Sequence, residues 1–430
     1  MKTRRHPRSQ TLFGNALVFE TLFRRAKATE LPRHWRSQTE FGNEAARRFR
    51  FLVPALAVLI LTIATAYAQG TRTLTARWVL DVERGEAIEN GLIIVKGDRI
   101  AALARKGEIA PEGEEVNLGE VTLLPGLIDA HVHLMLGGTA EANARATLKA
   151  GFTTVQDLGA LNYANIKIRN SIREGKFPGP TVVASGPWLG VSGGTCDFQG
   201  IGVKGPEAFR ARVKKDVDEG ADLIKVCASG WLAQAAERPD SVEISEEELR
   251  AAIDEAHALK RRVAVHAISE RAIAISVTNG ADLIVHGGFT TKETVAAMAQ
   301  RRVFQVPTLF SLRANVPATV YDKLQKHLGA AFREGLPIAF GTDAGVIRHG
   351  QNAKEFGELA GMGLKPIEAI RAATVEAAKA VGLPGQIGVL KGGALADIIA
   401  VEGNPLNDLT ALQKVKFVMK AGQPVDLAKL

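Results

Sequence analysis

From residue 121 onward, short runs of β-branched and aliphatic residues alternate with longer amphipathic segments along the chain. The segments 206–219 and 245–260 have helical spacing of apolar residues, and Ser245 with Glu248 makes a capping-box pattern at the start of the second. Eight strand–helix units at this spacing predict an α/β fold, a parallel (β/α)8 barrel of the TIM type. The predicted strands are residues 121–130, 152–158, 180–185, 221–227, 262–267, 281–286, 303–309 and 337–343.

The two flanks of this region have a different pattern, of short alternating strands punctuated by glycine. Residues 71–120 and 387–430 both show it, without crossover helices. We therefore expect a small composite β-sandwich domain that is built from both chain ends. A doubly wound open sheet is the alternative to the barrel, but no glycine-rich dinucleotide loop follows the first strand. The predicted boundaries are a leader at 1–68, the first part of the sandwich at 69–121, the barrel at 122–385 and the second part of the sandwich at 386–430.

Residues 51–68 form an uncharged apolar stretch directly after the basic segment 47–50, and they end in an Ala-Tyr-Ala pattern at Ala68. The most apolar part spans about 12 residues, which is short against the roughly 20 needed to cross a bilayer. This pattern is typical of a secretory signal peptide, so we expect export to a periplasm. An uncleaved N-terminal membrane anchor is the alternative. Residues 1–46 are long and polar for such a signal, which suggests that translation begins further along the chain.

The formal net charge of +8 belongs to the leader rather than to the folded part of the chain. Residues 1–68 hold 12 basic and 4 acidic residues, whereas residues 69–430 hold 42 of each. Binding of nucleic acid by counterion release needs positive charge on the folded domain, so we expect no nucleic-acid partner. We also expect no stable membrane partner after removal of the leader, and a homo-oligomer is compatible with the composition. Two cysteines exclude a disulfide scaffold and a thiolate zinc module.

Residues that bind metals stand at, or just past, the carboxyl ends of the predicted strands, where barrel enzymes place their reactive groups. His131 and His133 point to one face of a strand, because residues i and i+2 share a face. Imidazole and carboxylate suit a divalent metal, zinc or alternatively manganese. Taken singly, the other histidines have a structural alternative as core residues, and Lys225 could simply pair with Asp343. The predicted site comprises His131, His133, Lys225, His266, His286 and Asp343.

At these residues the sequence resembles the amidohydrolase superfamily, and within it the branch of imidazolonepropionase-like, Xaa-Pro dipeptidase and arginine-type carboxypeptidase proteins. The resemblance covers nearly all of residues 71–430. The matching motifs are LLPGLIDAHVHL (123–134), GADLIKVCASG (220–230), VAVHA (263–267), ADLIVHGG (281–288), FGTDAG (340–345) and GVLKGGALADIIAVEGNPL (388–406).

The resemblance implies a metal-dependent amidohydrolase that acts on carbon–nitrogen bonds, with two divalent ions and a carboxylated lysine. Reaction with CO2 turns the amine of Lys225 into an anionic carbamate, whereas an ammonium beside two divalent ions would be strongly repulsive. By resemblance, His131, His133 and Asp343 hold the first ion and His266 and His286 hold the second, with the carbamate bridging them. Asp343 would be the catalytic proton acceptor and would later deliver the proton to the leaving amine.

The loops after the strands carry the candidate substrate contacts. His349 is a candidate catalytic and substrate-binding residue, for a substrate carboxylate or a developing oxyanion, with a loop-packing histidine as the alternative. Arg348 is a candidate carboxylate clamp, with an exposed arginine as the alternative. Trp231 replaces a glycine of the related proteins and would narrow the pocket or stack on an apolar side chain.

The expected substrate is a small molecule with an amide bond, in the first place a dipeptide or an N-acyl amino acid with a free carboxylate. Hydrolysis of a cyclic amide, an imidazolone or lactam, is the second enzymatic hypothesis. A catalytically silent binding protein on the same barrel is the third. Cys196 and Cys227 both fall near the expected barrel mouth, where they could form a disulfide or remain two free thiols.

Overall fold

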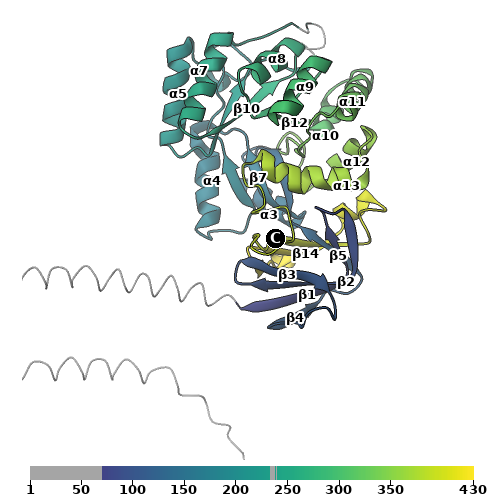
Figure 1. The fold of residues 1–430 in the computed structure, drawn as a ribbon. Helices are drawn as coiled ribbons and strands as arrows, with labels where there is room; N and C mark the ends of the chain where they lie inside the picture. Colours follow the sequence, from purple (N-terminus) through teal and green to yellow (C-terminus); the bar gives the residue numbers. More distant parts are fainter. Residues whose placement is uncertain (1–69, 233–237, 239) are drawn as a thin grey trace, which may run out of the picture. The chain divides into compact units, whose positions relative to one another are not determined.

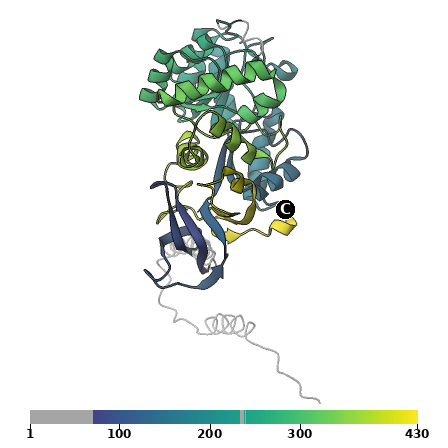
Figure 2. The same cartoon turned by 90° about the vertical axis from the view of Figure 1, so that its right-hand side faces the viewer.

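The computed structural model describes residues 70–232, 238 and 240–430. The central part is made of two parallel sheets, in the orders β6-β7-β8 and β12-β11-β10-β9. Their strands are fully or largely buried because helices cover them, as is usual for parallel sheets (Figures 1 and 2). The strands are β6 (Leu127–Val132), β7 (Phe152–Asp157), β8 (Thr181–Ala184), β9 (Leu223–Cys227), β10 (Arg262–Ala267), β11 (Leu283–His286) and β12 (Phe304–Val306).

Helices follow most of these strands, as the alternating pattern predicts. The capping box of Ser245 and Glu248 is present at the start of α7, with Glu248 N donating to Ser245 Oγ over 3.2 Å. The helices are α3 (Ala140–Lys149), α4 (Ala164–Arg173), α5 (Pro206–Asp218), α7 (Glu246–Ala258), α8 (Glu270–Thr278), α9 (Lys292–Arg301), α10 (Leu309–Asn315), α11 (Ala318–Arg333), α12 (Glu355–Gly361), α13 (Pro366–Arg371) and α14 (Ala377–Ala380).

The predicted strand 121–130 is two strands, β5 (Val121–Pro125) and β6, which belong to different sheets. The chain changes sheet at Gly126. A Cβ at this position would lie 2.2 Å from Oγ1 of Thr153 in β7, so the close approach requires glycine. The prediction of a single strand was wrong. The apolar composition continues through Gly126 and therefore does not mark the point where the chain changes sheet.

The predicted strand 337–343 does not form a regular strand, although it pairs on both sides. The N–H of Gln305 in β12 donates to the carbonyl of Pro337 over 2.8 Å, and the N–H of Asp343 donates to the carbonyl of His131 over 2.8 Å. Asp343 has a φ of 59°, a left-handed conformation that ends regular extension. The segment therefore lies between β12 and β6 as a paired but irregular stretch.

Both flanks of the chain contribute to one eight-stranded sheet in the order β15-β14-β13-β5-β1-β2-β3, with β4 paired to β1. The separate β-sandwich domain and the four predicted boundaries stay predictions. In Figure 1 this sheet lies at one end of the unit 67–430, and α7, α8 and α9 lie at the other. Its strands outside β5 are β1 (Thr71–Asp81), β2 (Glu86–Lys96), β3 (Arg99–Arg105), β4 (Glu114–Asn117), β13 (Ile398–Glu402), β14 (Val415–Lys420) and β15 (Gln423–Pro424).

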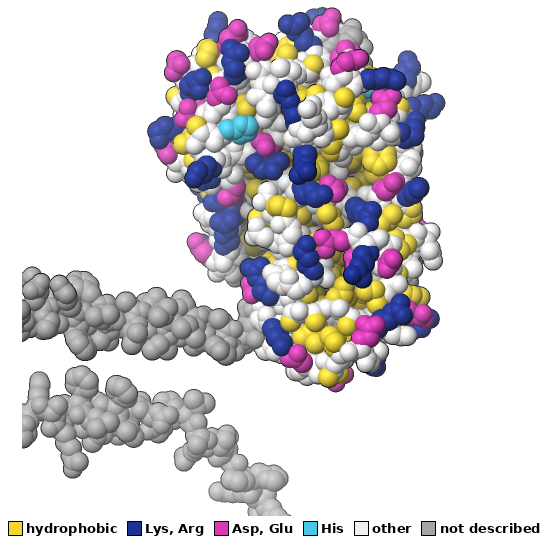
Figure 3. Space-filling view, in the orientation of Figure 1, with side chains coloured by type: hydrophobic (Ala, Val, Ile, Leu, Met, Phe, Trp, Pro, Cys, Tyr) yellow, Lys and Arg dark blue, Asp and Glu magenta, His cyan; other side chains and the backbone are white. Residues whose placement is uncertain are grey.

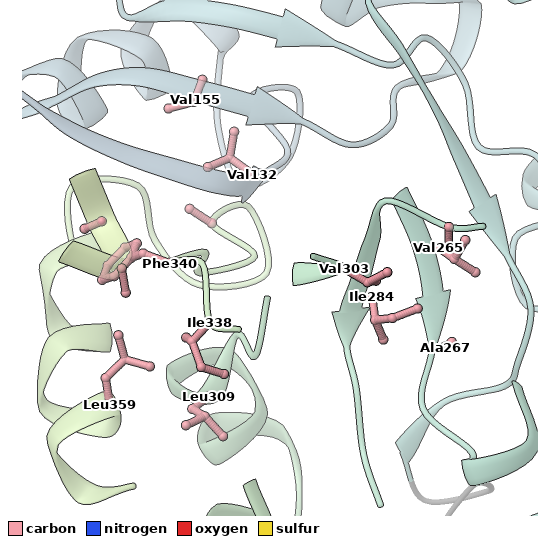
Figure 4. Packing of buried hydrophobic residues seen from close by; sticks show 14 of the residues in the cluster. Val132, Val155, Val265, Ala267, Ile284, Val303, Leu309, Ile338, Phe340 and Leu359 are labelled. Carbon is pink, nitrogen blue, oxygen red and sulfur yellow. The ribbon is translucent and has the colours of Figure 1, made fainter. Parts of the chain in front are cut away.

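The main hydrophobic core lies between the parallel strands and their helices. Phe340 belongs to it, with its ring centroid 5.4 Å from that of Phe152 and 4.5 Å from that of Phe356. Figure 4 shows Phe340 and Ile338 beside the helices, in the same cluster as Val132 of β6. This packing holds the 337–343 segment in place without a regular strand ladder.

On the face shown in Figure 3, basic and acidic side chains are interspersed over the surface. Among the described residues, no helix is both long and apolar enough to span a membrane. The predicted leader and signal peptide, residues 1–68, lie outside the described residues.

Candidate metal centre

Two histidines and one aspartate come together at the end of β6. Nε2 of His131 lies 3.2 Å from Nε2 of His133, and Oδ1 of Asp343 lies 3.5 Å and 3.3 Å from these two atoms. All three residues are buried, and one ligand atom from each fits within 4.8 Å of the others. This is a donor set that suits a divalent ion such as zinc.

The second pair of predicted histidines lies on the neighbouring strands β10 and β11. The ring centroids of His266 and His286 are 4.8 Å apart, and those of His286 and His131 are 5.0 Å apart. Nδ1 of His286 lies 2.8 Å from Oγ1 of Thr308, and Nε2 of His266 lies 3.2 Å from the carbonyl oxygen of Gly230. The structure therefore places all four histidines in one continuous row.

Lys225 of β9 faces the same space, and only 2% of its surface is exposed. Its Nζ has no hydrogen-bond partner among the described residues. Burial lowers the pKa of this amine to about 7, against the opposing attraction of Asp343. A buried amine without a partner is costly as an ammonium, and its neutral form is the one that reacts with CO2. The residue therefore fits the predicted carbamate.

Burial also keeps most of the imidazoles neutral, which a metal ligand must be. It lowers the pKa of His266 to about 3 and lowers those of His131 and His286 well below their ordinary value. Burial acts in the same direction on His133, but the hydrogen bond and charge of Asp343 outweigh it and raise its pKa. Nδ1 of His131 is buried without a partner among the described residues. These unsatisfied donors and acceptors fit a site built around cations.

Two residues of the centre have left-handed backbone conformations. Asp343 has a φ of 59° and His286 a φ of 65°. Such conformations cost roughly 1–3 kcal/mol for residues other than glycine and collect at functional sites. Both residues stand where the chain leaves its paired segments, and both belong to the proposed centre.

Asp129 holds together two parts of the chain that contribute to the centre. The sequence pattern did not predict this residue as part of the site. Its Oδ1 accepts from the N–H groups of His131 (3.1 Å) and Thr342 (3.0 Å), and its Oδ2 accepts from Thr342 Oγ1 (2.6 Å) and Asn352 Nδ2 (2.8 Å). Burial raises its pKa to about 6 against these hydrogen bonds. The carboxylate ties β6 to the segment that carries Asp343.

Of the predicted substrate contacts, the structure brings Trp231 to the centre. Its ring centroid lies 5.4 Å from that of His266, and it lines a cavity of about 370 Å³ together with His266, His286 and Asp343. Arg348 is exposed and is not among the described lining residues. The predicted role of Arg348 stays a prediction.

His349 lies beneath the centre rather than in this cavity. It is buried, its Nδ1 lies 3.0 Å from Oγ1 of Thr147, and its Nε2 lies 3.2 Å from the carbonyl oxygen of His133. Both ring nitrogens are thus engaged, and burial lowers its pKa to about 4. Its predicted catalytic and substrate-binding roles stay predictions, and its contacts are those of a residue that supports His133.

Residues at and just before α10 also contribute to the centre, and the sequence pattern did not predict them. Thr308, directly before this helix, contacts His286, and Ser311 Oγ lies 3.5 Å from Oδ2 of Asp343. Glu355 of α12 accepts from the N–H groups of Leu309 (2.8 Å) and Phe310 (2.7 Å), which holds the start of the helix. The available signal in the sequence was a polar residue after a strand. Serine and threonine are so common at such positions that this signal alone does not identify a site residue.

Cys196 and Cys227 form a disulfide. Cys227 ends β9 two residues after Lys225 and pairs in register with His266 of β10. The bond therefore connects the loop after β8 to the strand that carries the lysine.

Parallel strands that collect buried imidazoles, a carboxylate and a lysine at their carboxyl ends are typical of metal-dependent α/β enzymes. The chain belongs to the amidohydrolase family, whose model matches residues 122–425. This confirms the resemblance seen in the motifs. The chain is a hydrolase of this family with mixed α/β content, and its fold neighbours are of the TIM-barrel type.

Several known proteins are similar to the chain over most of its length. Ochratoxinase from Aspergillus niger is 27% identical, with 78% of this chain and 82% of the relative covered. The crystal structure of a Xaa-Pro dipeptidase with bound methionine in the active site is 28% identical with a TM-score of 0.77, covering 83% of this chain and 100% of that one. A prolidase complexed with N-methylphosphonate-L-proline is 29% identical with a TM-score of 0.75, covering 83% and 99%.

Proposed function

We propose that the protein is a dinuclear metal-dependent hydrolase of amide C–N bonds that acts on dipeptides or N-acyl amino acids. The observation that carries this proposal is the buried amine of Lys225, which has no hydrogen-bond partner among the described residues and lies beside Asp343 and two histidine pairs. A purely structural lysine would be expected to reach solvent or a carboxylate hydrogen bond. An amine that becomes an anionic carbamate supplies the negative charge that two cations need.

In this proposal His131, His133 and Asp343 would hold one ion, His266 and His286 would hold the other, and carboxylated Lys225 would supply an anionic ligand to the pair. The metals, zinc or alternatively manganese, would polarise the scissile carbonyl and favour ionisation of the attacking water. Asp343 accepts the proton of the attacking water and passes it to the leaving amine. Its hydrogen bond from Ser311 and its contact with His133 orient the carboxylate for that role.

The choice of substrate rests on the similar proteins, which include a Xaa-Pro dipeptidase and a prolidase. A terminal carboxylate and an amide bond are the features shared by dipeptides and N-acyl amino acids. Cyclic amides, the imidazolones and lactams, are the second substrate class to test with the same metals. We further propose that the two parallel sheets and the segment 337–343 form one closed barrel.

We also propose that the protein is exported, with Cys196–Cys227 forming in an oxidising compartment. A disulfide persists where thiols are not kept reduced, which agrees with a signal peptide ending near Ala68. Peptide mapping of the N-terminus of protein isolated from cells tests this. A start close to Gln69 is expected, and recovery of peptides from residues 5–33 contradicts cleavage.

The experiment that tests the function is metal analysis combined with a substrate screen on the purified protein. We expect about two divalent ions per chain, and hydrolysis of dipeptides or N-acyl amino acids that EDTA abolishes. Fewer than about one ion per chain, with no EDTA-sensitive activity toward any amide, would support a silent scaffold instead. Metal uptake that is indifferent to added bicarbonate would contradict the carbamate.

A further inference from the structure

The cavity that opens on His266, His286 and Asp343 has a predominantly apolar wall. Aliphatic side chains and an indole make up more than half of its described lining, and α10 forms one side of it. The apolar part of the lining consists of Trp231, Leu232, Ile268, Leu312, Val316 and Val346. At about 370 Å³ the space is large enough for one bulky side chain but not for an extended peptide.

Two residues of this wall are large apolar side chains left in contact with solvent. Trp231 is 51% exposed and Val346 is 52% exposed, and they lie on the loops after β9 and after the segment that carries Asp343. The other exposed large apolar side chains among the described residues are Met135 and Leu136, and neither lines the cavity. Exposed apolar surface beside a concave site indicates a ligand that covers it.

The charged residues of the wall also favour an apolar ligand group. Asp343 supplies a carboxylate, and no lysine or arginine is among the described residues that line the cavity. An acidic group bound at this wall would find no basic side chain to pair with, and Asp343 itself is taken up by the proposed metals. Arg348, the one predicted carboxylate clamp with a permanent charge, is not part of the lining either. A neutral apolar group therefore fits the cavity better than a charged one.

We propose that this cavity binds an aromatic or branched aliphatic side chain that flanks the scissile amide, and that it rejects an acidic one. The free carboxylate of the substrate then lies outside the cavity. The inference rests on the proposed hydrolase function and names its substrate class: dipeptides or N-acyl amino acids with a bulky apolar residue. Trp231 and Val346 are its specificity-determining residues.

The test compares matched substrates and matched variants of the full, metal-loaded protein. Phe-Ala, Leu-Ala, Asp-Ala and the reversed dipeptides vary one side chain on either side of the amide. At one of the two positions, we expect kcat/KM for the phenylalanine or leucine substrate to exceed that for the aspartate substrate by about ten-fold or more. Trp231→Ala and Val346→Thr should each reduce this preference, mainly through KM, while Trp231→Phe and the control Met135→Ala keep it.

Binding of free L-phenylalanine and L-aspartate, measured by calorimetry, separates this inference from the proposed function because neither contains an amide. Tighter binding of phenylalanine, weakened by Trp231→Ala and retained by Trp231→Phe, supports the cavity even if no peptide is hydrolysed. Hydrolysis without a side-chain preference, or a preference that Trp231→Ala and Val346→Thr leave unchanged, overturns the inference and leaves the hydrolase in place.

Discussion

Nδ1 of His286 lies 2.8 Å from the hydroxyl oxygen of Thr308, which has a left-handed φ of 49° just before α10. With Nδ1 engaged, the Nε2 side of the ring is left for the centre. The contact thus fixes the orientation of the imidazole, and in the tautomer that would bind a metal through Nε2 the Nδ1–H donates to the hydroxyl. Partners of this kind are worth about 10- to 100-fold in metal affinity in other metal sites.

Thr308→Val should therefore lower the affinity for the second metal by about 10- to 100-fold. Valine has the shape of threonine but leaves Nδ1 of His286 buried without a partner. Thr308→Ser keeps the hydroxyl and should retain most of the affinity. Competition with a chromogenic chelator measures the metal dissociation constants of the two variants. Equal affinities for the valine and serine variants would mean that Thr308 does not act through His286.

Lys225→Met should have opposite effects on metal content and on stability. Without the amine the proposed carbamate cannot form, so bound metal and activity should fall to near background. In the metal-free protein the same change replaces a desolvated amine with an apolar side chain of similar length, and the free energy of unfolding should rise by about 1–3 kcal/mol.

Inductively coupled plasma analysis and urea unfolding at pH 7.5, with metal removed for the second, give the two readouts for Lys225→Met. Lys214→Met is the matched control, because Lys214 is an exposed lysine on α5 that pairs with Asp218. Its effect on stability should stay within about 0.5 kcal/mol, with metal content unchanged. A Lys225→Met variant that is less stable without metal would assign the lysine a structural role.

The proximity of the six residues predicted for the metal centre could be expected from sequence, because each interrupts or ends an apolar run and the parallel arrangement brings such ends together. Asp129 could not be located in this way. It lies inside the buried run of β6, and its partners Thr342 and Asn352 follow 213 and 223 residues later. Its role depends on contacts that only the folded chain creates.

The same reason explains the errors in the strands. The run 337–343 has the composition of a strand, but its geometry is set by pairing to β12 and β6 and by the left-handed Asp343. The junction at Gly126 depends on the approach of Thr153 from another strand. Hydrophobic periodicity predicts that a segment is buried and extended. The register of a strand, the sheet to which it belongs and its departures from regular geometry depend on neighbours that are distant in sequence.

Asp129→Asn should destabilise the protein and lower its metal content together. All four partners of the carboxylate donate hydrogen bonds, so an amide NH2 would face donors on one side. We expect a loss of about 2–3 kcal/mol in the free energy of unfolding. Asp397→Asn is the control, because Asp397 is also buried but bonds to Lys420 and Ala421 in the large sheet.

The Asp397→Asn variant should lose stability without losing metal affinity. Urea unfolding and chelator competition on both variants distinguish the cases. A full metal affinity in folded Asp129→Asn protein would show that this carboxylate supports the fold alone.

Loss of the disulfide should lower the free energy of unfolding, because the unfolded chain without this crosslink has more conformational entropy. Cys196 and Cys227 are 31 residues apart, and closing a loop of this size is worth about 3–4 kcal/mol in the chain-entropy model. The double variant Cys196→Ser/Cys227→Ser should lose about this amount in urea unfolding. Reducing agent should destabilise the wild-type protein by a similar amount and leave the double variant unaffected. A response of the double variant to reductant would assign the effect to another cause.

The pH dependence of stability tests whether His349 is a buried neutral support of His133. Its pKa is lowered from 6.5 to about 4 by burial, so the unfolded chain binds a proton that the folded chain does not. Its contribution is therefore fully present above pH 6.5 and is lost as the pH falls through about 4, by up to roughly 3 kcal/mol. His349→Gln removes this titration, so the stability difference between the wild-type protein and the variant should shrink between pH 7 and pH 4. Urea unfolding of the metal-free wild-type protein and variant between pH 7 and pH 4 measures this difference in the free energy of unfolding. A difference that stays constant with pH would mean that His349 is solvated enough to titrate normally, as a residue that contacts substrate would be.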